Sequence, residues 1–334
     1  MDRTTLVYRN VSEIINKEKL SKLLENDTPV GYIGFAPTGK IHLGYLVPCM
    51  KIKDLTLANC RIAIMIADMH AMIDERKTPK HLVELRSEYY RRVLTCILEK
   101  IGANMLNIKF ISGSEFQLQP QYNLDVWDLS GRLTIGAAKK AGSEVVKQDK
   151  DPKLSSLLYP IMQVIDEKFV GPVAYQMQTS FELGGIDQKK IFCLSYDHNL
   201  SENEKLTYLM TPIISLAKTG KMSASGSAGK INLTDTEEDI QREITKAYCP
   251  NADPECGIMI LMKVVFFPLE GIIQMEKTEY TDYETFENDF KNGIFDARDL
   301  KKIVIVMIEK ILCPIKNYLL TNNMRKLVAD AYPY

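Results

Sequence analysis

The 334-residue chain carries 42 lysine and arginine residues against 43 aspartate and glutamate residues, a formal net charge of −1, and 46% of its residues are hydrophobic. This composition is ordinary for a globular protein and excludes a disordered chain. No apolar run reaches the roughly 18 residues of a membrane span. Residues 1–20 show neither a secretory nor a transit pattern, so we expect a cytoplasmic protein with no membrane partner. The length favours two domains.

The cysteines and the charge distribution give two further indications. The seven cysteines are scattered without a CxxC pair, which predicts neither a zinc site nor disulfides, so we expect no protein-bound metal and no tightly bound cofactor. Residues 132–153 contain six basic and three acidic residues, and residues 291–334 contain eight and four. Such basic stretches suit a phosphate backbone, and they equally suit a solvated surface.

In chain order, the first half alternates between strands and helices. Residues 30–35 predict a short strand and residues 41–58 a helix. Residues 61–67 form a continuous apolar run, typical of a strand buried on both faces. Thr78-Pro79 opens a helix predicted to reach residue 101, and residues 108–111 predict a third strand. This alternation indicates an α/β fold with a parallel sheet.

The second half becomes increasingly helical. We expect a helix over residues 151–169 after Asp151-Pro152, and a strand over 190–194. Helices are predicted over 236–247, 257–266, 283–290 and 298–312, and a boundary falls near 225–232, where glycine and serine are frequent. The sequence therefore predicts a parallel-sheet domain over residues 1–228 and a helical domain over residues 229–334.

A glycine-rich segment, residues 31–45, lies where the first strand passes into a helix. Free backbone N–H groups and the helix dipole favour an anion at such a corner. His42 is expected one turn inside the helix, where it can donate to a phosphate oxygen, and Gly44 would let a flat base approach the backbone. The spacing is not that of a Walker loop. The alternative is a plain strand–turn–helix corner with a capping histidine.

A second motif, Lys221-Met222-Ser223-Ala224-Ser225, lies between Gly220 and Gly226. A mobile lysine with two small hydroxyl side chains suits a phosphate group whose charge grows during reaction. Its composition is also that of a flexible polar linker. The two motifs are about 180 residues apart, and together they are more specific than either is alone.

A third group lies on the helix that follows Asp151-Pro152. Tyr159, Gln163 and Asp166 have the spacing i, i+4 and i+7, which puts them on one narrow stripe. The helix is otherwise apolar nearly all round, so it is expected to be buried with its polar stripe facing a pocket. The alternative is that the stripe faces solvent.

The fourth motif is Gly184-Gly185-Ile186-Asp187-Gln188, placed just before the strand expected at 190–194. Two glycines permit close backbone approach, and the carboxylate of Asp187 suits the paired hydroxyls of a ribose. Gly-Gly-x-Asp is also an ordinary turn sequence.

The first two motifs together resemble the two signatures of class I aminoacyl-tRNA synthetases, His-Ile-Gly-His and Lys-Met-Ser-Lys-Ser. Across the whole chain, the sequence is similar to the tyrosyl-tRNA synthetases of archaeal and eukaryotic type. The stretches that carry this resemblance are residues 32–44, 67–71, 114–118, 141–148, 157–166, 184–192 and 221–225. It implies a Rossmann-like catalytic domain with a dimer-forming insertion around residues 104–150, followed by an all-α anticodon-binding domain.

The resemblance also implies the reaction and its residues. Tyrosine would be activated by ATP with Mg²⁺ and transferred to tRNA(Tyr) by a homodimer. Tyr32 and Asp166 would contact the phenol hydroxyl, and the ammonium and carboxylate groups would be held by Tyr159, Gln163 and Gln188. Asp299 would read the anticodon, and His42 and Lys221 would stabilise the phosphate transition state. The ATP-binding set would be Gly34, Thr38, His42, Gly44, Tyr45, Gly185, Asp187, Lys221, Met222, Ser223 and Ser225.

The chain departs from the family pattern at three places. Tyr45 stands where the first signature ends in histidine, and Ala224 replaces the second lysine of the other signature. The segment 167–183 is several residues longer than usual and lacks an Asp-Ala-Gln-like run. These departures bear on the phosphate contacts and on one wall of the pocket.

Three alternatives remain open at this point. A tryptophanyl-tRNA synthetase would have the same fold and chemistry, although the polar stripe with Tyr32 favours a phenol over an indole. A small nucleotidylyltransferase uses a similar H-x-G-H corner, but the helical C-terminal region and the Lys221 motif disfavour it. The third alternative is a synthetase-like RNA-binding or signalling protein that has lost catalysis.

Overall fold

The computed structural model describes residues 1–74, 77–145, 153–198, 205–218, 229–275 and 277–333. The chain divides into two compact units, and helices α3 and α5 contribute residues to both. Unit 1 comprises residues 1–38, 54–91 and 104–211, and unit 2 comprises residues 39–53, 92–103 and 212–334.

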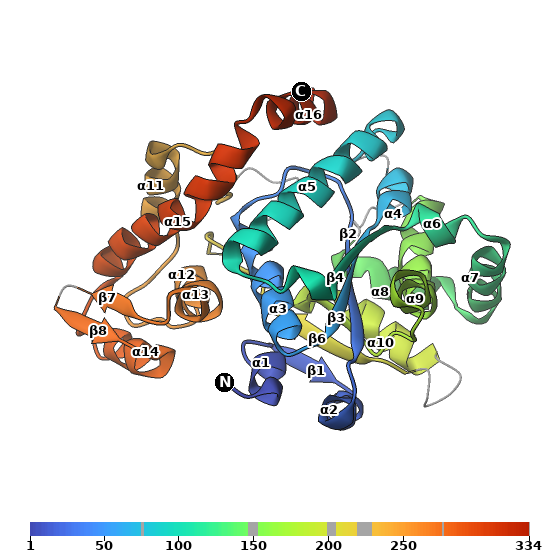
Figure 1. Cartoon of the computed structure of the whole chain (residues 1–334), viewed down its shortest axis with the longest axis horizontal. Helices are drawn as coiled ribbons and strands as arrows, with labels where there is room; N and C mark the ends of the chain where they lie inside the picture. The colour runs from blue at the N-terminus through green and yellow to red at the C-terminus, as the bar shows by residue number, and fades with distance from the viewer. Residues whose placement is uncertain (75–76, 146–152, 199–204, 219–228, 276, 334) are drawn as a thin grey trace. The chain divides into compact units, whose positions relative to one another are not determined.

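Unit 1 is built on a six-stranded sheet with the strand order β1-β6-β5-β2-β3-β4 (Figure 1). Parallel pairing joins β6, β5, β2, β3 and β4, and β1 is antiparallel to β6. Every residue of β2 except Gly34 is buried, as is every residue of β3 except Arg61, which explains their apolar sequences. The strands are β1 Glu13–Ile15, β2 Val30–Phe35, β3 Arg61–Ile66, β4 Ile108–Ser112, β5 Phe181–Gly185 and β6 Thr207–Thr211.

Helix α9 is the central helix of unit 1. It packs against β2, β3 and β4 and against helices α7 and α8. Its side of the core contains Phe116, Tyr122, Ile161 and Met162. The helices that contribute to unit 1 are α1 Arg3–Tyr8, α2 Lys17–Asn26, α3 Leu46–Leu57, α4 Asp68–Ile73, α5 Val83–Ile101, α6 Ser114–Gln117, α7 Pro120–Arg132, α8 Ile135–Ala141, α9 Leu154–Tyr175 and α10 Lys189–His198.

Unit 2 is predominantly helical and also contains a two-stranded antiparallel hairpin of β7 and β8. Thr236 and Asp239 form a capping box at the start of α11, which satisfies two backbone N–H groups there. Helices α11 and α15 pack together. The elements are α11 Glu237–Lys246, α12 Gly257–Leu261, α13 Phe267–Glu270, β7 Ile273–Met275, β8 Thr278–Tyr280, α14 Tyr283–Lys291, α15 Ala297–Leu319 and α16 Asn322–Ala331.

The structure confirms the strands predicted at 30–35, 61–67 and 108–111. The helix predicted over 151–169 is α9, which spans Leu154–Tyr175, and residues 151–152 lie outside the described residues. The strand predicted at 190–194 is wrong, because these residues lie within helix α10. The strand of this region is β5, which ends at Gly185. The helix-rich character predicted after residue 230 is confirmed, and the β7–β8 hairpin is an addition to it.

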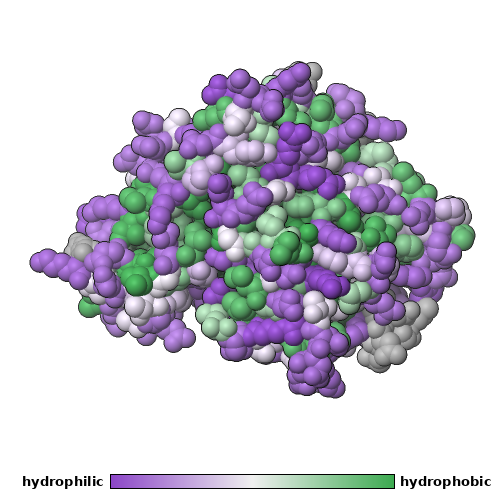
Figure 2. Space-filling model, in the orientation of Figure 1, coloured by the Kyte–Doolittle hydropathy of each residue, from purple (hydrophilic) through white to green (hydrophobic). Residues whose placement is uncertain are grey.

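Hydrophilic side chains cover most of the face seen in Figure 2, and hydrophobic residues appear there in small separate groups. Within the described residues, no helix combines the length and the apolar character that crossing a membrane requires. The largest exposed apolar side chains of α7 and its surroundings are Leu118, Leu124, Trp127 and Ile135.

Candidate active site

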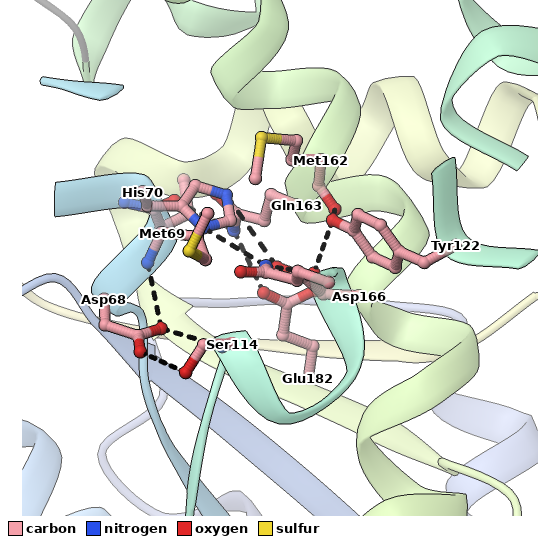
Figure 3. Close-up of polar contacts among 11 residues, drawn as sticks. Asp68, Met69, His70, Ser114, Tyr122, Met162, Gln163, Asp166 and Glu182 are labelled. Carbon is pink, nitrogen blue, oxygen red and sulfur yellow. Dashed lines mark hydrogen bonds and ion pairs between the residues drawn. The ribbon is translucent and has the colours of Figure 1, made fainter. Parts of the chain in front are cut away.

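Gln163 and Asp166 of the α9 stripe face a cluster of polar side chains in unit 1 (Figure 3). Asp166 is fully buried. One of its oxygens and four atoms of other residues are buried without a hydrogen-bond partner among the described residues. Leaving buried polar atoms without partners is costly unless a ligand supplies them. These atoms are Tyr32 Oη, His70 Nε2, Gln117 Oε1, Asp166 Oδ2 and Glu182 Oε2.

The Asp166 carboxylate is fixed by two donors from neighbouring helices. Gln117 Nε2 donates to Asp166 Oδ1 over 2.6 Å, and the Tyr122 hydroxyl donates to the same oxygen over 2.8 Å. Burial raises the pKa of Asp166 to about 7, although these two hydrogen bonds act in the opposite direction. His70 Nε2 lies 3.8 Å from Asp166 Oδ2. Burial lowers the pKa of His70 to about 4, so this contact is not an ion pair at neutral pH.

Gln163 joins the stripe to the neighbouring strand and turn. Its Nε2 donates to Glu182 Oε1 over 3.0 Å and to Gln188 Oε1 over 3.2 Å. Because both hydrogens of the amide are used, Gln163 Oε1 is left as an acceptor. Tyr159 lies one turn earlier on α9 with its ring edge-on to His70 at 4.5 Å between centroids. Burial raises the pKa of Tyr159, and the carboxylates of Asp74, Asp166 and Asp187 add to the effect.

Tyr32 enters the pocket from β2 with a fully buried phenol. Burial raises its pKa well above the usual value, and the carboxyl groups of Glu182, Glu167 and Asp166 raise it further. The hydroxyl is therefore a neutral donor and acceptor at every physiological pH. A neutral hydroxyl beside an oriented carboxylate is suited to a ligand group that both donates and accepts, such as a phenol or an alcohol.

The carboxyl ends of β2 and β5 lie side by side, because these strands are parallel neighbours. Gly34 is exposed near the end of β2, although the strand is central in the sheet. Gly185 ends β5, and Asp187 follows in a short 3-10 turn over Ile186–Gln188. The carboxyl ends of strands at a switch in strand order are where open α/β sheets bind ligands.

Two local features fix the backbone at these strand ends. A Cβ at Gly184 would lie 2.7 Å from the Phe192 ring and 2.9 Å from Gln188 Cγ, so glycine permits the close packing that positions Gln188. After β2, Thr38 accepts a 2.6 Å hydrogen bond at its carbonyl from Arg86 Nη1, which also donates to the Lys77 carbonyl.

His42 belongs to unit 2, and the expectation that it lies one turn inside a helix is wrong. It has extended backbone and precedes the 3-10 turn Leu43–Tyr45, and its Nδ1 accepts a 3.2 Å hydrogen bond from the Gly44 N–H. The imidazole hydrogen therefore resides on Nε2, which is a donor. Burial lowers the pKa of His42 to about 4, and the Lys230 charge acts in the same direction. The ring meets that of Tyr45 edge-on at 4.9 Å.

Other predicted residues lie elsewhere. Lys221, Met222, Ser223 and Ser225 lie outside the described residues. Asp299 is in the first turn of α15, where its Oδ1 accepts a 2.9 Å hydrogen bond from Lys302 Nζ. Within the described ranges, no group of three or more His, Cys, Asp or Glu side chains is arranged to hold a metal ion.

Sequence reasoning identified the α9 stripe and Tyr32 but assigned no role to their surroundings. His70 and Gln117 belong to stretches that carry the family resemblance, and Tyr122 comes from α7. Glu182 lies in the segment 167–183, which departs from the family pattern. That segment, 167–183, is the C-terminal part of α9, a turn at the left-handed residue Gln176, and most of β5. In the sequence, the signal for Glu182 is a single acidic residue between two apolar ones, Phe181 and Leu183.

Comparison with known proteins agrees with this architecture. Residues 24–313 match the family of tRNA synthetases class I (W and Y). The cytoplasmic tyrosine--tRNA ligase of Gallus gallus is 38% identical over 341 residues, an alignment that covers 99% of this chain and 63% of the relative. The chain thus spans less than two thirds of the length of that relative. The tyrosine--tRNA ligase of Natronomonas pharaonis is 35% identical, with 100% of this chain and 98% of the relative covered.

A solved structure gives the same result. Tyrosyl-tRNA synthetase from Archaeoglobus fulgidus, crystallised with L-tyrosine, superposes with a TM-score of 0.85 at 32% identity and covers 96% of this chain and 100% of its own. Sequence and fold are therefore similar over almost the whole chain. The chain belongs to the class I tRNA synthetases (W and Y), in the tyrosyl-tRNA synthetase branch represented in archaea and eukaryotes.

Proposed function

We propose that the protein is a tyrosine–tRNA ligase (EC 6.1.1.1), which activates L-tyrosine with ATP and transfers the tyrosyl group to the 3′ end of tRNA(Tyr). The observation that carries this proposal is the buried pair of Tyr32 Oη and Asp166 Oδ2, both without a protein partner in the described part of the chain. The Archaeoglobus fulgidus relative was crystallised with L-tyrosine, which supports the same class of ligand here.

In the proposed complex, the substrate phenol lies between Tyr32 and Asp166. Asp166 Oδ2 accepts the phenol hydrogen, since Oδ1 is already occupied by Gln117 and Tyr122. The ammonium and carboxylate groups lie toward Tyr159, Gln163 and Gln188. The acceptor Oε1 of Gln163 suits the ammonium group, because both amide hydrogens of Gln163 are used within the protein.

The residues proposed to bind ATP include those at the carboxyl ends of β2 and β5 and, from unit 2, those of the His42 turn. Gly34, Gly44 and Gly185 permit close approach of the nucleotide, and Asp187 accepts from its ribose. Thr38, Tyr45, Met222, Ser223 and Ser225 complete the proposed ATP-binding set. Mg²⁺ arrives as the ATP complex and shields the phosphate charges.

The first step forms tyrosyl-adenylate. A carboxylate oxygen of tyrosine attacks the α-phosphorus of ATP, the bond to the β-phosphate oxygen breaks, and pyrophosphate leaves with the electron pair. His42 donates from Nε2 to a phosphate oxygen and Lys221 stabilises the charge on the departing pyrophosphate. In the second step a ribose hydroxyl of the tRNA 3′ end attacks the tyrosyl carbonyl carbon, and AMP leaves.

The domain assignment belongs to the same proposal. Residues 1–228 would form the catalytic domain and residues 229–334 the anticodon-binding domain. Asp299 lies on the first turn of α15 with a side chain about one third exposed, where a carboxylate can accept from an unstacked base. We place the protein in the cytoplasm, in line with the names of its eukaryotic relatives.

A homodimer is proposed through the region around residues 104–150. Leu118, Leu124, Trp127 and Ile135 come from α6–α8 and their connections and are 64%, 52%, 66% and 74% exposed. Four large apolar side chains so exposed within eighteen residues are unusual on a monomer surface and are typical of an interface.

The experiment is aminoacylation of tRNA by the purified protein with labelled tyrosine and ATP. Accumulation of tyrosyl-tRNA that requires both ATP and tRNA(Tyr) is the expected result. Tyrosyl-adenylate formation without transfer would remove the second step from the proposal. Charging with tryptophan in place of tyrosine would contradict the assignment of the pocket.

A further inference from the structure

Glu182 is a buried acid that the proposed reaction does not use. It lies on β5 directly opposite Tyr32 of β2, and on its other side it is opposite Tyr208 of β6. Side chains of register partners in neighbouring strands project to the same face of the sheet. Tyr32, Glu182 and Tyr208 therefore form one row beneath α9, and Glu182 is only 2% exposed.

The two oxygens of Glu182 have different surroundings. Oε1 accepts the hydrogen bond from Gln163 Nε2 over 3.0 Å. Neither the buried Oε2 nor the Tyr32 hydroxyl has a hydrogen bond of normal geometry among the described residues, although the two groups are close enough for each to shift the pKa of the other. Figure 3 shows Glu182 extending from the sheet toward Gln163 and Asp166.

The direction of the hydrogen bonds follows from Asp166. Its Oδ1 accepts from Gln117 and Tyr122, so the carboxylate is an acceptor and the substrate phenol donates to Oδ2. A phenol has a single hydrogen. Its oxygen must therefore accept from Tyr32, and the Tyr32 oxygen can then only accept from Glu182.

Resting on the proposed binding of tyrosine, we infer that Glu182 is a positioning residue: once tyrosine is bound, Glu182 holds a proton on Oε2 and donates it in a hydrogen bond to the Tyr32 hydroxyl. This turns the Tyr32 hydrogen toward the phenolic oxygen of the substrate. Glu182 thereby acts on specificity through Tyr32, without touching the substrate.

The other titratable groups around Glu182 agree with a protonated acid. Asp166 and Glu167 face it from α9, Tyr32 from β2 and Tyr208 from β6. Burial raises the pKa of Glu182 well above its usual value, and the charges of Glu167 and Asp166 raise it further, whereas hydrogen bonds with Gln163 and Tyr32 act in the opposite direction. The Tyr208 hydroxyl donates to Glu167, whose oxygens lie 3.0 and 3.2 Å away. Because Glu167 accepts this hydrogen bond, we assign the negative charge of the two glutamates to Glu167 and the proton to Glu182.

Two variants separate this role from simple packing. Glu182→Gln keeps an acceptor for Gln163 and a donor for Tyr32, whereas Glu182→Met keeps the size and neither function. We expect Glu182→Met to lower kcat/KM for tyrosine in ATP–pyrophosphate exchange by about 10- to 100-fold, the range for one lost buried hydrogen bond. Glu182→Gln should restore it to within about threefold of the original protein.

Phenylalanine provides the matched substrate. It has no phenolic oxygen for Tyr32 to reach, so Glu182→Met should change its kcat/KM by less than about threefold. Equal losses for tyrosine and phenylalanine would indicate a packing defect and overturn the inference. If Glu182→Gln were as impaired as Glu182→Met, the donor role would also be overturned.

The proton itself is visible in the infrared. At pH 7 the original protein should show a protonated carboxylic acid C=O band that shifts in D₂O and is lost in Glu182→Gln, in addition to the band of Asp166, whose own pKa is about 7. Absence of that band in the original protein would contradict the inference even if tyrosine exchange is normal. Absence of tyrosine exchange in the original protein would instead overturn the proposed function, so the two failures are distinguishable.

Discussion

The Tyr122 hydroxyl donates a 2.8 Å hydrogen bond to Oδ1 of Asp166, and Oδ2 of the same carboxylate has no partner in the described residues. The neighbouring side chains thus fix the carboxylate in one orientation and leave one oxygen for a ligand. A buried acid held in this way costs the folded protein stability when it is ionised, as expected for a group kept for binding.

Replacing Asp166 by asparagine should have opposite effects on activity and on stability. We expect kcat/KM for tyrosine to fall by at least about 100-fold, because a charged buried acceptor is lost. The free energy of unfolding at pH 8 should rise, because Asp166 has a pKa of about 7 in the folded protein against 3.8 ordinarily. That difference in pKa corresponds to about 4 kcal/mol in the free energy of unfolding.

Because the pKa of Asp166 is raised in the folded protein, the stability of the protein should depend on pH in a predictable direction. The folded protein retains the Asp166 proton between about pH 4 and pH 7 while the unfolded chain has lost it, so the stability of the original protein falls as pH rises through this window. The Asp166→Asn variant has no proton to lose at this position, and the two stabilities should converge near pH 4. Denaturant unfolding of both proteins at several pH values measures this. The control is Asp197→Asn, a change of an exposed aspartate on α10. A difference in stability between the original protein and Asp166→Asn that stays constant across pH would contradict the account.

Replacing Tyr32 by phenylalanine should weaken selection of the phenol. We expect the ratio of kcat/KM for tyrosine over phenylalanine to fall by about 10- to 100-fold, because the hydroxyl that contacts the substrate oxygen is removed. Pyrophosphate exchange with each amino acid measures the ratio.

Tyr175→Phe is the matched control for this change. The Tyr175 hydroxyl lies within hydrogen-bond distance of the backbone carbonyls of Ile62 and Asn107 and has no place in the proposed pocket. Its removal should lower stability by about 1 kcal/mol and leave the ratio unchanged. A fall in the ratio for Tyr175→Phe but not for Tyr32→Phe would refute the placement of the phenol.

Replacing His42 by alanine should slow adenylate formation by about 100-fold or more, because a donor to the transition-state phosphate is lost. The affinity for tyrosine should be nearly unchanged. The pKa of His42 is about 4, so the imidazole is neutral and its ionisation should not appear in the rate between about pH 6 and pH 8. Single-turnover adenylate formation measures the rate, and the exposed His81→Ala change is the control. An equal loss of tyrosine affinity would remove the role given to His42.

Replacing Trp127 by glutamate should convert the proposed dimer to monomers, because a buried charge disfavours an apolar interface. Sedimentation at several protein concentrations measures this. Val306 is 63% exposed and lies on α15, outside residues 104–150, so Val306→Glu serves as the control. A monomeric original protein, or a dimer that Trp127→Glu leaves intact, would contradict the interface.

Replacing Asp299 by alanine should reduce charging of tRNA by about 10-fold or more and leave tRNA-independent pyrophosphate exchange unchanged, because the residue is proposed to contact only the anticodon. The exposed Asp330→Ala change on α16 is the control. Loss of exchange in Asp299→Ala would show that the residue acts on folding and not on the anticodon.

The sequence allowed the parallel sheet, the α9 stripe and the helix-rich C-terminal region to be predicted, because hydrophobic periodicity marks long buried elements. Strand β5 and helix α10 were misread for a local reason. Glu182 interrupts the apolar pattern of β5, whereas the apolar stretch Ile191–Leu194 belongs to α10 and looks like a strand over a short window.

The site was predictable only where a stripe or a motif identified it. Tyr159, Gln163 and Asp166 follow from helical spacing. The partners Gln117, Tyr122 and Glu182 come from three other elements, and only the sheet register and the packing of α6 and α7 on α9 bring them together. His42 was placed in the helix because the motif does not reveal that its Nδ1 accepts from Gly44.

The central claim is tested most directly by ATP–pyrophosphate exchange with the purified protein, Mg²⁺ and each of the twenty amino acids in turn, without tRNA. The account predicts exchange with tyrosine, weak or absent exchange with phenylalanine, and none with tryptophan. Exchange with tryptophan, or no exchange with any amino acid, would contradict it.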